Sequence, residues 1–483
     1  MNPHPSVDPH PPSAALAAAT ASELAADLAA GRITSVALTW ALLDRIAAID
    51  DAGPELGAVL AVNPQAIEEA GILDDERAEG STRGPLHGLP VLIKDNIEAI
   101  GLPGTAGSLA LAGREVVCDA DLVASLRSAG LIVLGSANLS EWANLRSPMS
   151  TSGWSAVGGL TGNPWALDRS AGGSSAGSGA ALAAGLVPLA IGTETDGSIT
   201  CPSSLNGVVG LKPTVGLVST QGVVPLSGSQ DSPGPMARNV RDVALLLDAL
   251  TGSSRYSEAP GTLSVPELWL GVATGWLSGH EATDRLFAAT MEQLRSAGAS
   301  LADVEVSPVA GTSAAELTVL LCELKDDLDA YLGARPGEGV RCLADVVAFN
   351  DEHHDLELAH FGQEFLQQAL ATRGRADPAY AEARARCLAW ALKETLEPAF
   401  TTASAPEFLV APAYAPAWKS DLRGGDHFLG GGPSSAAPSI AGWPVLCLPM
   451  GLIDGLPVGL VLVGKQNSEA RLLAAGHAIE NAL

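Results

Sequence analysis

The sequence predicts an α/β fold with a mixed, mostly parallel central sheet that is covered by helices on both faces. Helical and strand patterns alternate along the chain, for example over residues 121–130 and 131–135, and this alternation is typical of layered folds with parallel interior strands. Residues 89–93 form an apolar run, which indicates a buried strand. With 47% hydrophobic and 17% charged residues, the chain has enough apolar surface for an extensive core.

The N-terminal elements are expected to be helices that lead to this first buried strand. Residues 13–49 predict two helices, because Gly31 can end the first and Thr34 can cap the second. The charged pattern of residues 66–79 predicts a surface helix. After a turn, the strand follows over residues 89–94.

The stretch of residues 170–213 carries glycine and serine clusters at both ends of an apolar segment, residues 180–191. That segment is too short to cross a bilayer and predicts a buried helix leading into a strand. Glycine allows the backbone to turn sharply or to approach a ligand. We therefore expect both ends of the stretch to meet at one chemical site, with residues 138–146 forming a helix or loop over it.

The remaining patterns predict short strands, a long helical segment and a closing strand pair. In order they are strands at 215–218 and 223–225, a helix at 240–250, a strand at 268–272, helices at 316–332 and 355–371, strands at 445–450 and 456–464, and a helix at 469–483.

The charge of the chain argues against a nucleic-acid partner. The formal net charge is −27 at pH 7, whereas phosphate binding requires a basic surface. The six cysteines are scattered without C-x-x-C pairs, so neither a zinc ribbon nor a disulfide framework is indicated. No secretory signal and no run of transmembrane length is visible. We expect a cytoplasmic monomer or homodimer with neither nucleic-acid nor membrane partners.

Four short motifs together resemble one family. They are GLPVLIKDN at 88–96, GGSS at 172–175, DGSI at 196–199 and GLKP at 210–213. In this order and spacing they resemble the amidase signature family, and the similarity is strongest over residues 85–241. Four motifs are far more specific than any one of them.

The resemblance implies a single large amidase-signature domain over residues 13–483. The catalytic core would span residues 85–241, a helical insertion lining the substrate cleft residues 312–401, and C-terminal strands and a helix residues 442–483. Residues 1–12, which are rich in proline and histidine, are expected to be mobile.

Amide hydrolysis needs a nucleophile, a base, donors for the oxyanion and an acid for the leaving amine. Lys94 ends the apolar strand, and burial disfavours an ammonium, so this lysine could act as a base near neutral pH. None of the nine histidines falls within the glycine and serine clusters, and nothing in the sequence favours a Ser-His-Asp triad.

Carried over residue by residue, the resemblance implies a Ser-Ser-Lys triad and an acyl-serine intermediate. Ser198 would be the nucleophile, Ser174 the bridging serine with a cis peptide bond, and Lys94 the base behind it. The oxyanion hole would be formed by the backbone N–H groups of Thr195, Asp196, Gly197 and Ser198.

Each residue of the triad also has a simpler explanation when it is taken alone. Ser174 would belong to a glycine-rich turn that caps a helix, Lys94 would reach solvent with its stem buried, and Ser198 would be an ordinary loop serine. Three elements at matching separations favour the catalytic interpretation.

Other kinds of site fit the sequence less well, and we expect neither a cofactor nor a metal. A phosphate-binding loop needs a lysine after its second glycine, and the cluster at 172–179 contains none. The same cluster lacks the third glycine and the preceding strand of a dinucleotide fingerprint. Residues 351–355 (DEHHD) do not match H-E-x-x-H, so a solvated helix face is the favoured interpretation.

The substrate is expected to be a small-molecule or short-peptide amide. Many family members carry arginine two positions after the nucleophile, where this chain has Thr200, which disfavours a substrate carboxylate there. Together with residues 138–144 and 323–325, this variant resembles the bacterial peptide amidases, and we expect Ser175, Asn144 and Thr200 to contact the substrate. The alternatives are an amidotransferase subunit that supplies ammonia within a complex, an amidase or esterase of small aryl or aliphatic amides, and a noncatalytic binding module.

Overall fold

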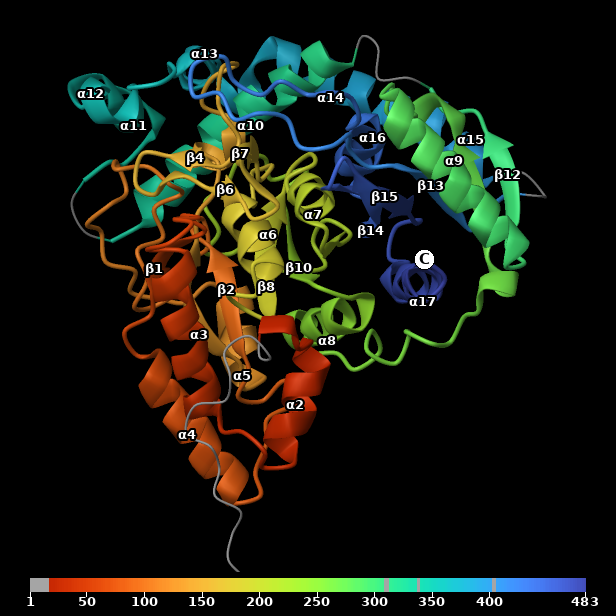
Figure 1. The fold of residues 1–483 in the computed structure, drawn as a ribbon. Helices are drawn as coiled ribbons and strands as arrows, with labels where there is room; N and C mark the ends of the chain where they lie inside the picture. The colour runs from red at the N-terminus through yellow and green to blue at the C-terminus, as the bar shows by residue number, and fades with distance from the viewer. Residues whose placement is uncertain (1–16, 308–311, 337–338, 402–404) are drawn as a thin grey trace, which may run out of the picture.

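The structure is a computed structural model that describes residues 17–307, 312–336, 339–401 and 405–483. The N-terminal segment 1–12, expected to be mobile, lies outside these residues. A twisted sheet runs through the middle of the molecule, with helices packed around it (Figure 1). This arrangement confirms the predicted α/β class.

The central sheet has eleven strands. Across the sheet they are β1 (Val59–Val62), β3 (Ile132–Ala137), β2 (Pro90–Lys94), β8 (Leu189–Glu194), β10 (Ser232–Ala237), β9 (Val209–Lys212), β14 (Val445–Ile453), β15 (Leu456–Val463), β13 (Phe408–Pro412), β11 (Trp269–Ala273) and β12 (Ser300–Val304). Two small hairpins lie outside it, β4 (Trp154–Ser155) with β5 (Gly159–Leu160) and β6 (Gly162–Asn163) with β7 (Ala166–Ser170).

The sheet is mixed, as predicted, but it is not mostly parallel. Parallel pairing is confined to β3–β2–β8 and to β13–β11–β12, and the six other neighbouring pairs are antiparallel. The helix between β8 and β9 does make these two strands run in the same direction, as the alternation predicts. However, β10 inserts between them and pairs antiparallel with both.

Sixteen α-helices of the described residues surround the sheet. They are α2 (Ala21–Ala29), α3 (Ser35–Ile49), α4 (Ala66–Ala78), α5 (Asp121–Ser128), α6 (Ala176–Ala183), α7 (Thr200–Asn206), α8 (Val240–Thr251), α9 (Glu281–Ser296), α10 (Ser313–Ala334), α11 (Leu343–Glu352), α12 (His354–Glu357), α13 (Glu364–Ala371), α14 (Pro378–Leu388), α15 (Glu397–Phe400), α16 (Pro433–Ala441) and α17 (Glu469–Glu480). Short 3-10 turns are η1 (Glu141–Asn144), η2 (Val265–Glu267), η3 (Thr274–Trp276) and η4 (Gly374–Ala376), and η5 (Ala389–Leu396) is a π-helix.

Helices cover both faces of the sheet, as expected for an α/β layer fold. Alternate residues of β14 show this, because successive side chains of a strand point to opposite faces. Leu446 and Leu448 lie in a core shared with α8 and α17, whereas Val445 and Cys447 lie in a second core shared with α7 and α16.

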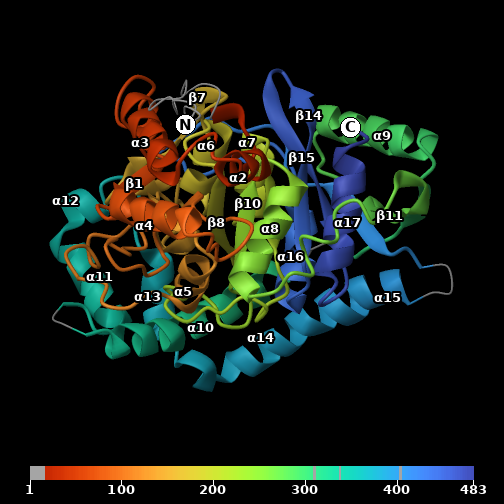
Figure 2. The same ribbon diagram turned by 90° about the horizontal axis from the view of Figure 1, so that it is seen from below.

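The helices α10 to α15 follow one another along one side of the molecule (Figure 2).

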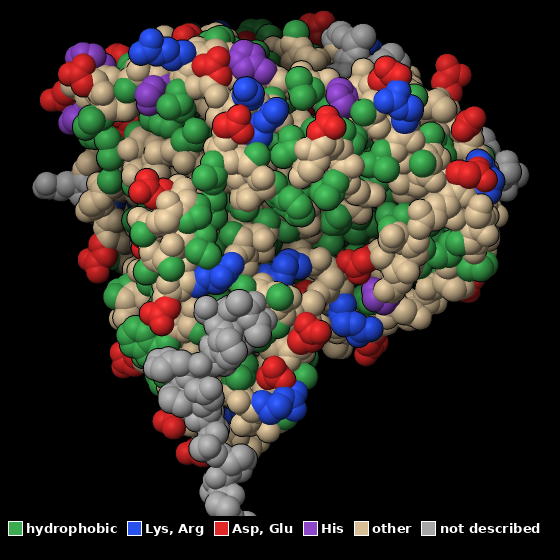
Figure 3. Space-filling view, in the orientation of Figure 1, with side chains coloured by type: hydrophobic (Ala, Val, Ile, Leu, Met, Phe, Trp, Pro, Cys, Tyr) green, Lys and Arg blue, Asp and Glu red, His purple; other side chains and the backbone are tan. Residues whose placement is uncertain are grey.

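Acidic side chains are scattered over the face shown in Figure 3 and do not form one patch there. The strong negative charge of the chain therefore does not mark a single binding surface on that face.

Three predictions for individual elements are wrong. Residues 215–218 form no strand, because their backbone closes a turn through the bond from Leu217 N to Thr214 O, and residues 223–225 contribute only an isolated bridge between Val223 and Ile97. The predicted helix over 355–371 is broken between α12 and α13. In that gap Gln363 donates its side-chain amide to the Val347 carbonyl at 3.1 Å, and this contact is not visible in a helical pattern.

Candidate active site

A buried lysine and a buried serine meet where β2 ends and α6 begins. Lys94 and Ser174 are both fully buried, and Lys94 Nζ donates to Ser174 Oγ at 2.7 Å. The same amine donates to Thr193 Oγ1 at 2.9 Å and to the Thr193 carbonyl at 3.1 Å. The lysine is therefore held by three acceptors and does not reach solvent.

Strand pairing brings these residues together. β2 runs parallel to β8 with Ile93 opposite Ile191, so Lys94 at the end of β2 lies beside Thr193 near the end of β8. Ser174 precedes the first turn of α6, and its peptide bond with Gly173 is cis. The carboxyl ends of neighbouring parallel strands thus present the lysine to the glycine-rich turn.

Burial changes the acid–base behaviour of the lysine. Desolvation lowers the pKa of Lys94 to about 7, although the nearby carboxyl groups of Asp231 and Glu194 oppose this shift. An ammonium that is removed from water loses its hydration, which favours the neutral amine. Near neutral pH the amine can therefore accept a proton.

The segment of residues 195–198 forms a tight turn after β8. Glu194 anchors the end of this turn, because its Oε2 accepts hydrogen bonds from the backbone N–H groups of Ile199 at 2.7 Å and Thr200 at 2.9 Å. Gly197 has φ +79°, and a Cβ at this position would lie 2.4 Å from Tyr414 Oη. The position therefore accepts only glycine without a shift of the tyrosine.

The glycine and serine clusters on either side of the apolar segment 180–191 meet at one cavity, as the sequence predicts. The backbone N–H of Ser175 donates to the Ser198 carbonyl at 3.1 Å, which ties the two turns together. The cavity has a volume of about 200 Å³. It is lined by Ala143, Asn144, Leu145, Ser152, Gly173, Ser174, Thr195, Asp196, Ser198, Cys201, Leu226, Leu320, Tyr414 and Phe428.

Buried carboxyl groups surround this cavity, and two of them, Asp231 and Glu316, stand outside the four motifs. Asp231 accepts from Thr195 Oγ1 at 2.6 Å and from two backbone N–H groups, and burial raises its pKa to about 6. Burial also raises the pKa of Asp196 well above its usual range, with a further contribution from Glu316. Gln230 connects the Thr195 carbonyl to Glu316.

These supporting residues had no sequence signal comparable to the four motifs. Asp231 and Gln230 precede β10, and Glu316 lies on α10, far along the chain from the turn that they support. A buried carboxyl beside a lysine is recognised only when the two are adjacent in space.

The three residues expected to contact substrate lie in different environments. Asn144 lines the cavity. The hydroxyl of Ser175 donates to the Thr193 carbonyl at 3.2 Å, and that of Thr200 donates to Glu194 Oε2 at 3.2 Å. Both residues are buried and their hydroxyl groups support the turns, whereas Asn144 is part of the cavity wall.

Within the described part of the chain, no cluster of three or more His, Cys, Asp and Glu residues could hold a metal ion. In the segment 351–355, His353 stacks on Phe349 with ring centroids 4.0 Å apart. In the same described residues, no helix is both long enough and apolar enough to span a bilayer.

The chain is similar over most of its length to known amidases. A family model described as Amidase matches residues 37–473. A peptide amidase structure from Stenotrophomonas maltophilia is 44% identical, with a TM-score of 0.89 and coverage of 96% of both chains. A relative from Arabidopsis thaliana named "Probable amidase" is 37% identical, covering 93% of this chain and 87% of its own length. A glutamyl-tRNA(Gln) amidotransferase subunit from Symbiobacterium thermophilum is 33% identical over 92% of each chain.

Proposed function

This chain belongs to the amidase signature family and is an amide hydrolase, and on that premise we propose that it converts the C-terminal amide of short peptides into the acid and ammonia. The observation that carries the proposal is the buried contact of 2.7 Å between Lys94 and Ser174 beside a cavity that Ser198 also lines. The similarity to solved peptide amidases at 45% identity supports the choice of substrate.

The proposed mechanism begins with attack by Ser198. Its Oγ bonds to the carbonyl carbon of the amide, and its proton passes to Ser174 while Ser174 gives its own proton to the neutral amine of Lys94. Lys94 Nζ already lies at hydrogen-bond distance from Ser174 Oγ, so this relay needs no rearrangement of the lysine. Geometry and a lowered pKa together make the lysine a suitable base.

The negative charge on the carbonyl oxygen is stabilised by backbone N–H groups of Thr195, Asp196, Gly197 and Ser198, each effective donor contributing a factor of about 10² to 10³ in rate. When the C–N bond breaks, the relay runs in reverse and protonates the leaving nitrogen, which departs as ammonia. Water then attacks the acyl ester on Ser198 with the help of the same relay, and the acid is released.

The cavity walls favour a substrate whose acyl group carries side chains over a substrate with a very small acyl group. Leu145, Leu226, Leu320 and Phe428 provide apolar surface around the polar turns, which suits the mixture of apolar and polar groups in a peptide. The position two residues after Ser198 is Thr200, whose hydroxyl donates to Glu194. No arginine is therefore present there to bind a substrate carboxylate.

A second candidate function is to supply ammonia within an amidotransferase complex. The full-length similarity to a component of such a complex, at 33% identity, supports it. The two functions differ in their substrate, glutamine against a peptide amide, and in their dependence on partner proteins.

The decisive experiment measures ammonia released by the isolated protein from a panel of C-terminal peptide amides, propionamide and glutamine. We expect kcat/KM for the best peptide amide to exceed that for glutamine by at least about tenfold, since side-chain contacts contribute to transition-state binding. Activity on glutamine alone, or activity only after partner proteins are added, would favour the amidotransferase function.

The pH dependence of kcat/KM provides a second prediction. The pKa of Lys94 is about 7, and only the neutral amine can accept a proton, so kcat/KM should fall as the pH drops below about 7 and level off above it. Initial rates between about pH 5 and about pH 9, on both sides of the midpoint, measure its position.

The Asp231→Asn variant tests the assignment of that midpoint. The negative charge of Asp231 raises the pKa of Lys94, so its removal should move the midpoint to lower pH. A midpoint that does not move, or that moves upward, would mean that another group controls the profile.

A further inference from the structure

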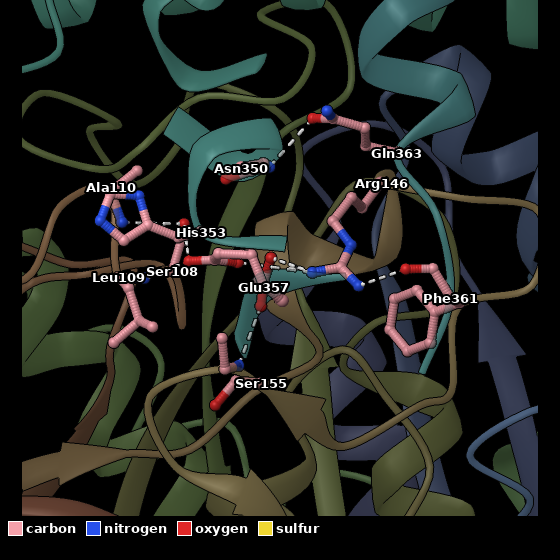
Figure 4. Close-up of polar contacts among 12 residues, drawn as sticks. Ser108, Leu109, Ala110, Arg146, Ser155, Asn350, His353, Glu357, Phe361 and Gln363 are labelled. Carbon is pink, nitrogen blue, oxygen red and sulfur yellow. Dashed lines mark hydrogen bonds and ion pairs between the residues drawn. The ribbon is translucent and has the colours of Figure 1, made fainter. Parts of the chain in front are cut away.

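A buried ion cluster joins the loop beside the cavity to the helices along one side of the molecule. We call it the Arg146 cluster and define it as Arg146, Glu141 and Glu357, whose side chains are at most 1% exposed. Arg146 Nη1 lies 2.6 Å from Glu141 Oε1. The same atom lies 3.5 Å from Glu357 Oε2, and Figure 4 shows Arg146 beside Glu357. The mechanism proposed above does not use any of these three side chains.

Aromatic rings and backbone groups complete the surroundings of the guanidinium. Its central carbon lies 4.1 Å from the ring centroid of Phe361 and 5.1 Å from that of Trp154. Arg146 Nη2 also donates to the Phe361 carbonyl at 3.1 Å. A planar cation can stack and form directed hydrogen bonds at the same time, which an ammonium cannot.

The two carboxyl groups are anchored separately. Glu141 Oε2 accepts from the Ala156 backbone N–H at 2.9 Å. Glu357 Oε1 accepts from Ser108 Oγ at 3.0 Å and from the Leu109 backbone N–H at 2.6 Å (Figure 4). The cluster therefore connects the backbone at Leu109, Ala156 and Phe361, together with helix α12, to one guanidinium.

The charges in the cluster are unequal, with one cation facing two carboxyl groups. Burial raises the pKa of Glu141 well above its usual range, and the neighbouring Glu357 adds to this shift. A retained proton would leave the cluster neutral, as is favourable away from water. One ionised carboxylate is then enough to pair with Arg146.

Between Glu141 and Arg146 lies a backbone segment in an unusual conformation. Trp142, Ala143 and Asn144 have φ angles of 49°, 51° and 74°, in the left-handed region that residues other than glycine rarely adopt. Such a conformation persists only where the surrounding structure imposes it. Residues 143–145 also form part of the cavity wall.

We propose that the Arg146 cluster is a positioning device that fixes the wall of residues 143–145 and so selects the acyl part of the substrate. This inference rests on the proposed function and extends it to substrate choice. The cluster acts through Ala143, Asn144 and Leu145, because Arg146 itself does not line the cavity within the described residues.

The effect should depend on how far a substrate extends from its reacting carbonyl. The turn of residues 195–198 and the triad lie apart from residues 143–145 in the chain and are held by Glu194 and Lys94. Both regions line the same cavity, but a peptide amide extends further from its reacting carbonyl and should contact more of the wall of residues 143–145 than a minimal amide does. Loosening the wall should therefore weaken the binding of a long substrate more than that of a short one.

The test compares the Arg146→Met variant with the wild type on a dipeptide amide and on propionamide. We expect KM for the dipeptide amide to rise by at least about tenfold while kcat/KM for propionamide changes by less than about threefold. Arg335→Met is the matched control, because Arg335 is 6% exposed and pairs with Glu98 at 2.7 Å away from the cavity wall. Arg335→Met should alter the kinetics of the two substrates to the same small extent.

Two milder variants keep the test independent of whether Arg146→Met folds. Glu357→Gln keeps the acceptor for Ser108 and Leu109 but removes one of the two carboxyl groups that face Arg146, so KM for the dipeptide amide should rise by less than in Arg146→Met, without a matching change for propionamide. Arg146→Lys keeps the charge but loses the stacked, forked contacts, so KM for the dipeptide amide should rise without a matching change for propionamide.

Equal losses on both substrates, or an unchanged KM for the dipeptide amide in folded Arg146→Met and Arg146→Lys, would overturn the inference. Failure of the proposed function would look different. In that case the wild-type protein itself would release no ammonia from the peptide amides.

Discussion

The Ser198→Ala variant is expected to lose about 10⁴-fold or more in kcat on any amide that the wild type hydrolyses. The loss follows from the proposed role of Ser198, because without its hydroxyl no acyl ester can form and the Ser174 and Lys94 relay has no proton to carry. Ser198 is nearly buried in a turn supported by Glu194, so removal of one oxygen should leave the fold intact. Ammonia release measures the rate, and intact-protein mass spectrometry of the wild type during turnover detects the acyl form.

The control for this variant is Ser178→Ala on α6. Ser178 is also a buried serine, but its hydroxyl donates to the Ile191 carbonyl at 3.0 Å inside the core. We expect it to change kcat by less than about tenfold, as most substitutions away from a reacting group do. Substantial ammonia release by folded Ser198→Ala would contradict the acyl-serine mechanism.

The Lys94→Met variant should lower kcat/KM by about 10³-fold, within the range of about 10² to 10⁴ that a general base contributes. Methionine resembles the lysine stem in shape and has no cost of burying a charge, although Ser174 and Thr193 lose a hydrogen-bond partner. We expect the variant to fold, with circular dichroism to verify it. The residual rate should also lose the dependence on pH near the pKa of about 7 that Lys94 has in the wild type.

Lys212→Met is a matched control for this second variant. Lys212 is the other fully buried lysine of the described residues, burial lowers its pKa to about 8, and its amine donates to the Pro213 carbonyl at 3.2 Å. If lysine burial alone mattered, the two variants would lose similar activity. A loss confined to Lys94→Met supports the role of Lys94 as the base, and equal losses would remove that support.

Much of the fold was predictable from local patterns. The strand at 89–94, the helix followed by a strand across 180–191 and the closing strands after residue 445 correspond to β2, to α6 with β8, and to β14 with β15. These elements are runs of apolar residues bounded by turn residues, which is the pattern of buried strands and helices. The interrupted helix over 355–371 was not predictable, because Gln363 and Phe361 bind to partners in other segments.

Part of the candidate site was likewise predictable from the sequence, and part was not. Lys94 and Ser174 stand in motifs, and their contact 80 residues apart in the chain is present in the structure, while their catalytic roles and that of Ser198 remain predictions. Asp231 and Glu316 were missed, because a single carboxyl in a turn or helix carries no local signal. They matter because they are buried close to reactive groups: Asp231 raises the pKa of Lys94, and Glu316 raises the pKa of Asp196.

By itself, the sequence determined the family, the α/β class and the positions of the lysine and the two serines, because each motif combines side chains with the glycine-rich backbone that they need. Gly197 illustrates this, since its φ of +79° is a local requirement. Only the tertiary structure decided the insertion of β10 between β8 and β9 and the assembly of the Arg146 cluster. The contacts of that cluster join segments as far as 249 residues apart, and pairing over such distances depends on the whole folded chain and leaves no periodic trace in the sequence.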